Sequence, residues 1–147
     1  MFYFFTFLVT TFYKTPIILK GFFLTNVLIV FLGGGIGASA RYLLSTALSR
    51  TTNSSFPYGT FVVNVLGCLL IGFLMSMFEE RFLVNPALRM FLTIGILGGF
   101  TTFSTFSYET ITLLNDAQFL YAGLNIALSI VTCLGATYVG MTLGKMV

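Results

Sequence analysis

Four long apolar stretches dominate the sequence, at residues 21–40, 56–78, 87–114 and 119–143. A helix that crosses a membrane needs about 20 mostly apolar residues, and each stretch is long enough. Hydrophobic residues make up 57% of the chain and charged residues 7%, and the mean hydropathy is +1.00. In soluble proteins about a quarter of the residues are charged. The sequence therefore predicts an all-α integral membrane protein with four transmembrane helices.

The first 20 residues differ from these stretches. They are rich in aromatic residues and contain Lys14, Pro16 and Lys20, so they offer no full span. A signal peptide is the alternative, but its charges should precede the apolar run and a small-residue cleavage site should follow. We expect residues 1–20 to form an interfacial or disordered extension, and residues 21–147 to form one four-helix transmembrane domain.

Composition excludes several classes of function. The chain has no histidine, and its two cysteines, Cys68 and Cys133, lie inside apolar runs, which argues against a metal cluster or a disulfide framework. No paired carboxylates and no nucleophile beside a base occur in the spans, so an enzyme is not expected. The net charge of +3 comes from residues near the membrane edges. We therefore expect these charges to contact lipid headgroups, and we do not expect a nucleic-acid partner.

The centre of the third stretch combines two glycines, Gly98 and Gly99, with a run of hydroxyl residues up to Ser107. Lipid offers no hydrogen-bond partner, so non-helical backbone at membrane depth must be buried in protein or line a wet cavity. We therefore expect this helix to be broken mid-membrane, from Gly98 to Thr101, beside an ion or solute path. Carbonyls ending the first half-helix suit a hard cation, whereas N–H groups starting the second suit an anion.

Phe103 and Phe106 follow this break and project in similar directions on a helix, beside the Ser104 and Thr105 hydroxyls. Such a pair commonly faces lipid or packs between helices. Alternatively, the electropositive ring edges contact a partly dehydrated anion. The spacing leaves both interpretations open.

Polar residues also occur in the second and fourth spans. Asn64 is either a hydrogen-bonding contact between helices or a pathway residue. Ser129, Cys133 and Thr137 recur every four residues and so share one helix face. Isolated hydroxyls in membrane helices usually bond their own backbone, but three polar groups in register favour a pathway. Pairs of glycines four apart in spans one, three and four favour homo-oligomerisation: Gly33 and Gly37, Gly95 and Gly99, Gly140 and Gly144.

Two other functions remain open beside a passive channel. A proton-coupled exporter needs an ionisable carboxylate at membrane depth, and Glu109 lies only toward the end of the third span without an acidic partner. A non-transporting subunit of a membrane assembly is the second alternative.

Three motifs then identify a family: GGGIGASARYLLS in span one, GTFVVNVLGCLLIGF in span two and GGFTTFSTFSYE in span three. In order and spacing they resemble the Fluc, or CrcB, fluoride channels. The resemblance covers residues 33–144, and only the N-terminal extension has no counterpart. It implies an antiparallel, dual-topology homodimer in the cell (inner or plasma) membrane, with two pores for fluoride and a central structural sodium ion (Na+). Such a channel exports fluoride passively from the cytoplasm.

The resemblance also implies roles for single residues. Gly98 and Thr101 resemble the residues whose backbone carbonyls hold sodium, and Phe103 and Phe106 the pair whose ring edges meet fluoride. Further pathway positions by motif are Asn64, Ser104, Thr105, Ser129, Thr137 and Glu109, with Arg41 at a vestibule. Cys133 falls where a hydroxyl would stand in the polar track of the fourth span.

The basic residues bear on topology. The side with both termini carries Lys14, Lys20, Arg81, Arg89 and Lys145, against Arg41 and Arg50 on the other. Dual insertion needs near balance under the positive-inside rule. We therefore expect the extension to be dispensable or to be only partly read by the insertion machinery.

Overall fold

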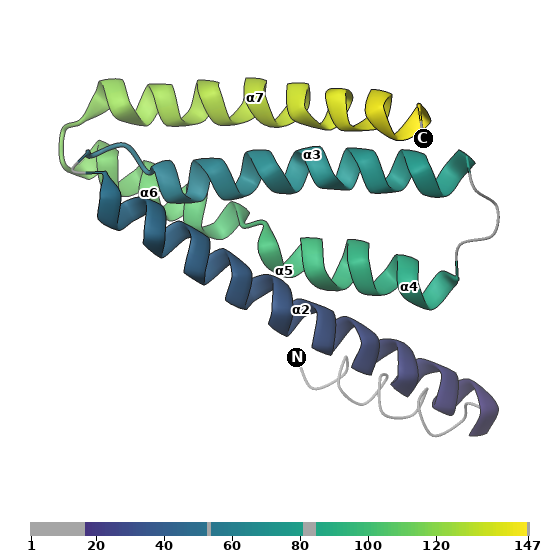
Figure 1. Ribbon diagram of the computed structural model, residues 1–147. Coiled ribbons are helices and arrows are strands. Elements are labelled where there is room, and N and C mark those ends of the chain that lie inside the picture. Colours follow the sequence, from purple (N-terminus) through teal and green to yellow (C-terminus); the bar gives the residue numbers. More distant parts are fainter. Residues whose placement is uncertain (1–16, 53, 81–84, 147) are drawn as a thin grey trace, which may run out of the picture.

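The computed structural model describes residues 17–52, 54–80 and 85–146, and every regular element in these ranges is helical. Three long helices are α2 (Ile17–Thr51), α3 (Tyr58–Glu80) and α7 (Phe119–Lys145) (Figure 1). Between α3 and α7 the chain forms α4, a π-helix η1, α5 and α6, with the bounds Pro86–Met90, Phe91–Leu97, Gly98–Phe100 and Phe103–Asn115.

Four segments are long and apolar enough to cross a membrane, namely Gly21–Thr51, Tyr58–Glu79, Pro86–Asn115 and Phe119–Lys145. This result confirms the predicted all-helical fold with four spans. The first helix continues past Ala40, where the sequence placed its end. Residues 1–16 of the expected extension lie outside the described residues, and residues 17–20 begin α2.

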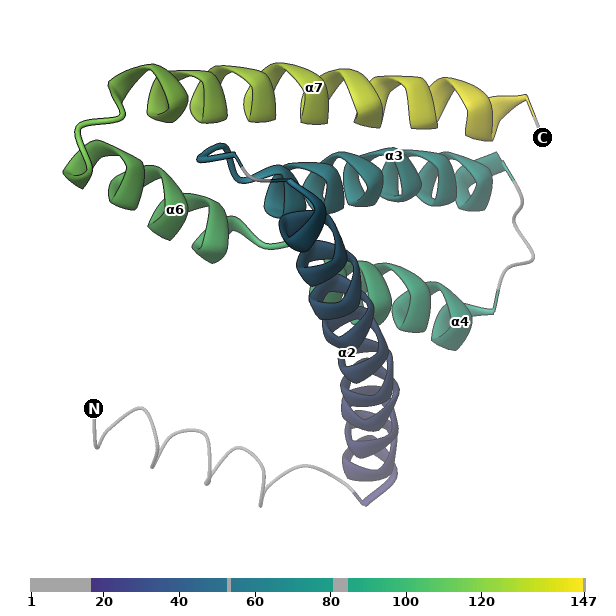
Figure 2. The ribbon, with the colours of Figure 1, turned by 60° about the vertical axis from the view of Figure 1, so that its left-hand side comes forward.

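Helices α3 and α7 lie side by side and run in the same direction (Figures 1 and 2). Their backbones touch because glycine stands at the closest points. A Cβ atom on Gly72 would overlap the Thr137 carbonyl oxygen, and one on Gly140 would overlap the Leu69 carbonyl oxygen. Small residues allow this approach, so the relative height of α3 and α7 is fixed by backbone contact.

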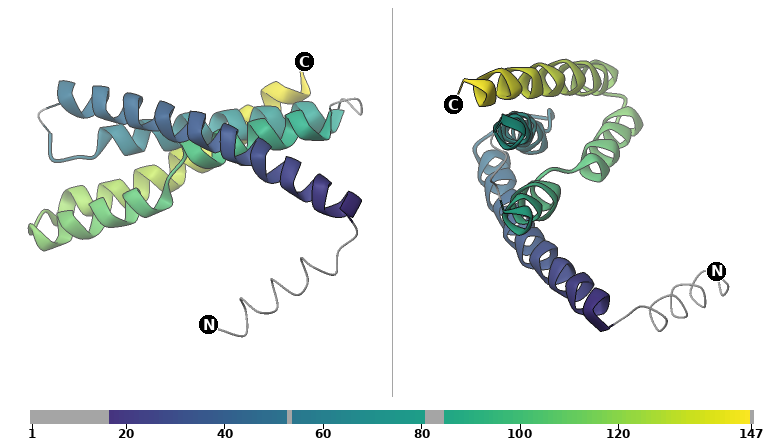
Figure 3. Two further views of the ribbon diagram at one scale, coloured as in Figure 1. Left: turned by 90° about the horizontal axis from the view of Figure 1, so that it is seen from below. Right: turned by 90° about the vertical axis from the view of Figure 1, so that its right-hand side faces the viewer.

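Helix α2 packs by the same means against η1 and α5, since a Cβ atom on Gly37 would overlap the Ile96 carbonyl oxygen. Its N-terminal half leaves the other helices (Figures 2 and 3) and exposes large apolar side chains such as Phe31. The glycine pairs of spans one, three and four all make contacts within the chain. The sequence had assigned these faces to homo-oligomerisation, so that argument for a dimer was wrong.

The third segment changes backbone conformation at Thr101 and Thr102, where ψ is 157° and 114°, between α5 and α6. Gly98 and Gly99, expected to start the interruption, are helical. Gly99 serves packing, because a Cβ atom there would lie 2.5 Å from the Gly34 carbonyl oxygen, whereas Gly98 is exposed. The extended residues are β-branched threonines, which favour extended backbone.

Candidate functional site

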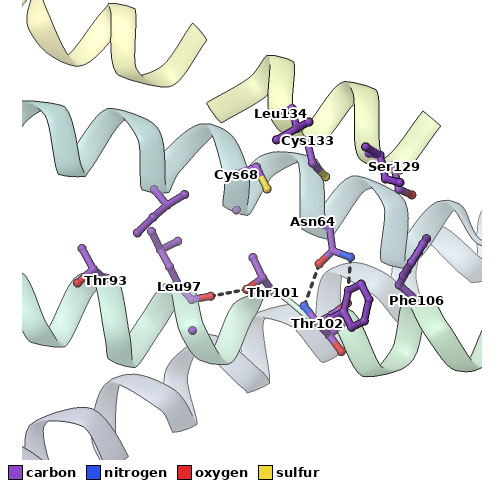
Figure 4. A pocket seen from close by; sticks show the side chains of 15 residues that line it. Asn64, Cys68, Thr93, Leu97, Thr101, Thr102, Phe106, Ser129, Cys133 and Leu134 are labelled. Carbon is purple, nitrogen blue, oxygen red and sulfur yellow. Dashed lines mark hydrogen bonds between the residues drawn. The ribbon is translucent and has the colours of Figure 1, made fainter. Parts of the chain in front are cut away.

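A cavity of about 540 Å³ lies beside this extended pair. It is lined by residues of α3, η1, α5, α6 and α7 and is open on one side, and Figure 4 shows side chains from these elements converging on it. Amide, hydroxyl and thiol groups alternate there with apolar side chains, and no acidic or basic residue is among those that line it. The polar members are Asn64, Cys68, Thr93, Thr101, Thr102, Ser129 and Cys133.

Asn64 holds the extended backbone in place from the neighbouring helix. Its Oδ1 accepts a hydrogen bond from the Thr102 N–H (2.8 Å), and its Nδ2 donates to the Thr102 carbonyl oxygen (3.0 Å) (Figure 4). These bonds satisfy two backbone groups that a continuous helix would pair internally, and unpaired groups are costly away from water. The sequence left two roles open for Asn64, a hydrogen-bonding contact between helices and a pathway residue. In the structure Asn64 bonds the backbone of the third segment and also lines the cavity.

Thr102 in turn begins α6. Its Oγ1 accepts from the Thr105 N–H (3.2 Å), donates to Thr105 Oγ1 (3.0 Å) and lies 3.2 Å from Ser104 Oγ. Thr102 thus acts as the N-cap, a position that threonine favours. In a continuous helix the Thr102 and Thr105 N–H groups would reach the carbonyls of Gly98 and Thr101. Both N–H groups are directed elsewhere, so these two carbonyls lose their helical donors.

The two phenylalanines lie at the start of α6. Their ring centroids are 5.5 Å apart with an interplanar angle of 42°. Both line the cavity; Phe106 is partly buried, whereas 79% of Phe103 is exposed. The pair therefore lies at the rim of the cavity. Phe106 points inward, and Phe103 lies on the outer surface of the chain.

The polar face of α7 reaches the cavity only in part. Ser129 and Cys133 line it, but the Thr137 hydroxyl donates to the Cys133 carbonyl oxygen of its own helix (3.0 Å) and is not among the lining residues. The backbone of Thr137 lies where α3 and α7 touch at Gly72, one turn beyond Cys133. The local bond is the usual one for a threonine in a membrane helix.

Sequence reasoning missed a buried network behind Phe106. Asn125 is 1% exposed; its Nδ2 donates to Thr110 Oγ1 (2.9 Å), and its Oδ1 accepts from Ser129 (3.5 Å). Thr110 donates to the Phe106 carbonyl oxygen (2.7 Å), so the network supports the backbone that carries this ring. The signal was present, because Asn125 precedes Ser129 by four residues and extends the polar face by one turn.

Arg41, Thr105 and Glu109 lie outside the large cavity. Arg41 and Thr105 line a smaller one of about 200 Å³, together with Thr60 and Thr102. Glu109 lines a third of about 380 Å³ near the α2–α3 connection, where its Oε1 accepts from Thr60 (2.8 Å). Thr102 borders both the large cavity and the Arg41 cavity, and Thr60 borders the Arg41 cavity and bonds Glu109. Polar groups thus continue from the large cavity to that end of the helices.

The fold and these cavities define a small multi-pass membrane protein whose helices surround a group of polar side chains. The chain belongs to the CrcB family: the family described as CrcB-like protein, Camphor Resistance (CrcB), matches residues 28–141.

Relatives of similar length carry one name, "Fluoride-specific ion channel FluC". The chain is 46% identical over 120 residues to that of Clostridium novyi (strain NT), covering 82% of this chain and 94% of the relative. For Elusimicrobium minutum (strain Pei191) the identity is 44% over 131 residues, covering 88% and 98%. The family resemblance is thereby confirmed, as is the prediction that the protein is not an enzyme.

Proposed function

We propose that this protein is a fluoride-selective channel through which fluoride leaves the cytoplasm passively, down its electrochemical gradient, which lowers fluoride toxicity. The observation that carries this proposal is the identity of 44–46% to relatives named fluoride-specific ion channels, over nearly their whole length. The three motifs of the sequence lie within the matched residues 28–141.

The chemistry of the large cavity supports a passive anion path. Fluoride is strongly hydrated, so a path must replace its lost water with donors. Asn64 Nδ2 uses one N–H on Thr102, and its second is available to an ion. The ring edge of Phe106, with Phe103 at the rim, supplies further positive ends of dipoles. The single O–H of Ser129 bonds Asn125 at 3.5 Å and would serve the ion after rotating toward the cavity. Each contact is weak, which permits exit.

Proton coupling is less well supported by this cavity, because no carboxylate lines it. Glu109 lies in a different cavity, beside Thr60. We place Arg41, Thr105 and Glu109 at a vestibule beyond the large cavity, with Ser104 beside Thr102 at the change in backbone. Thr137 continues the polar face of α7 past the large cavity and ends it at the contact with Gly72.

The protein works as an antiparallel, dual-topology homodimer with the extended pair Thr101–Thr102 at mid-membrane. Support comes from the exposure of Phe103 and Gly98 on the open side of the cavity, which a second copy would cover. The carbonyls of Gly98 and Thr101 have lost their helical donors and are hard oxygen ligands of the kind that suit Na+. Together with the same carbonyls of a second copy they would hold one ion, which would supply positive charge between the two chains.

Fluoride efflux from proteoliposomes tests this function. We expect the purified protein to release trapped fluoride at a rate that does not depend on an imposed proton gradient. Efflux that requires the proton gradient would establish an exporter instead. Absence of efflux, from protein shown to be folded and inserted, would favour the non-transporting subunit.

A further inference from the structure

Two thiols from different helices meet at one level of the large cavity. Helices α3 and α7 run in the same direction and touch where Gly72 approaches the Thr137 carbonyl. One helical turn before each contact residue stand Cys68 and Cys133. Because equal steps along parallel helices keep the same height, this backbone contact places the two thiols opposite each other.

The side chains confirm this placement. Both cysteines line the cavity, and Figure 4 shows their sulfur atoms directed into it. Both thiols are free, and they lie close enough to interact electrostatically. They are the only cysteines of the chain, which has no histidine. Apart from the methionine sulfurs, these two thiols are therefore the side-chain ligands through which the chain can bind a soft metal ion.

We propose that Cys68 and Cys133 form a two-thiolate site for one soft, thiophilic cation that prefers two ligands, of the class of Hg²⁺, Ag⁺ or Cu⁺. Thiolates select such metals, and the thiolate is the binding form. For Hg²⁺ two S–H bonds break, two S–Hg bonds form and two protons are released to the water of the cavity. No electron transfer is involved.

Occupation of this site has a consequence that rests on the proposed channel function. The next turn toward α6 carries Asn64 on α3 and Ser129 on α7, the two groups assigned above to the anion path. A metal bridge would tie α3 to α7 one turn from them and fill part of the same cavity. Fluoride flux should therefore fall when the site is filled.

Titration of the purified, detergent-solubilised protein with Hg²⁺ alone tests the site. After each addition, thiols still reactive toward methyl methanethiosulfonate are counted under denaturing conditions that keep Hg²⁺ bound. We expect one equivalent of Hg²⁺ per chain to protect both thiols of the wild type. The C68S and C133S variants each supply a single-thiol control, and the C68S/C133S variant reports binding elsewhere.

A bridge also resists competition, because the second thiol acts at high effective concentration; removal of Hg²⁺ by a monothiol should need at least about ten times more reagent than in either single variant. If two equivalents are needed to protect both thiols, or if wild type and single variants release Hg²⁺ alike, the two-thiolate site is overturned.

Fluoride efflux then tests the consequence, with each protein compared with itself before and after one equivalent of Hg²⁺. We expect several-fold inhibition of the wild type and none of the C68S/C133S variant. Unchanged efflux from the bridged wild type would overturn the obstruction. Failure of the proposed function is distinguishable, since it would appear as absence of efflux before any metal is added, with the stoichiometry unaffected.

Discussion

Asn64 is the residue on which the backbone around Thr102 most depends. One side chain on α3 pairs with both the N–H and the carbonyl of Thr102, 38 residues further along the chain. We predict that Asn64→Ala lowers the free energy of unfolding by about 1–3 kcal/mol for each backbone group left unpaired. The melting temperature in detergent should fall accordingly.

Thr112→Ala is the matched control, because its hydroxyl bonds only the Tyr108 carbonyl of its own helix (3.0 Å) and lies on the exposed side of α6. It should leave the melting temperature nearly unchanged. Should Asn64→Ala abolish flux and yet melt like this control, Asn64 would be an ion ligand and not a support for the backbone.

Phe106 gives a second prediction at this scale. Phe106→Ile keeps an apolar side chain but removes the ring edge from the cavity. If that edge stabilises the ion in the path by about 1 kcal/mol, fluoride efflux should fall about five-fold while the protein stays folded. Phe119→Ile, at an exposed position at the start of α7, should have no effect on efflux. Equal efflux from both variants would refute an essential ring-edge contact.

At the scale of elements, the helices are held by backbone contact at glycines more than by a large apolar core. We predict that Gly37→Ala separates α2 from η1, since its methyl group would overlap the Ile96 carbonyl. Overpacking of this kind costs about 1–3 kcal/mol, so the melting temperature should fall. Gly135→Ala on α7 meets nothing within 4 Å and should be neutral or mildly stabilising, since alanine is the better helix former. Equal melting temperatures would contradict this packing.

The elements also show which parts of the structure could be predicted from sequence. The four spans were predictable because hydropathy and length decide them locally. The π-helix at Phe91–Leu97 and the helical conformation of Gly99 were not, because both lie against α2, where Gly95 meets Gly33 and Gly99 meets Gly34. For the site, the register of Ser129 and Cys133 predicted their place on the cavity. The shift of Thr105 and Glu109 to other cavities depends on contacts between helices that spacing along one helix does not contain.

At the scale of the whole molecule, the basic residues bear on the orientation of the chain in the membrane. Without Lys14 and Lys20, three basic residues on the side of the C-terminus face two on the other. A bias this small favours neither orientation strongly under the positive-inside rule. The proposed antiparallel dimer requires both orientations in one membrane, which makes orientation a direct test of the assembly.

Single cysteines on opposite ends of the spans, placed in the C68S/C133S background, provide that test. Ser55→Cys lies in the α2–α3 connection and Glu79→Cys at the other end of α3, and both positions are exposed. With dual insertion, an impermeant maleimide applied from one side should label about half of each variant, because half of the chains present that end. A single orientation would instead give full labelling of one variant and none of the other. That complementary pattern would rule out the antiparallel dimer, and with it a sodium site built from Gly98 and Thr101 of two oppositely inserted chains.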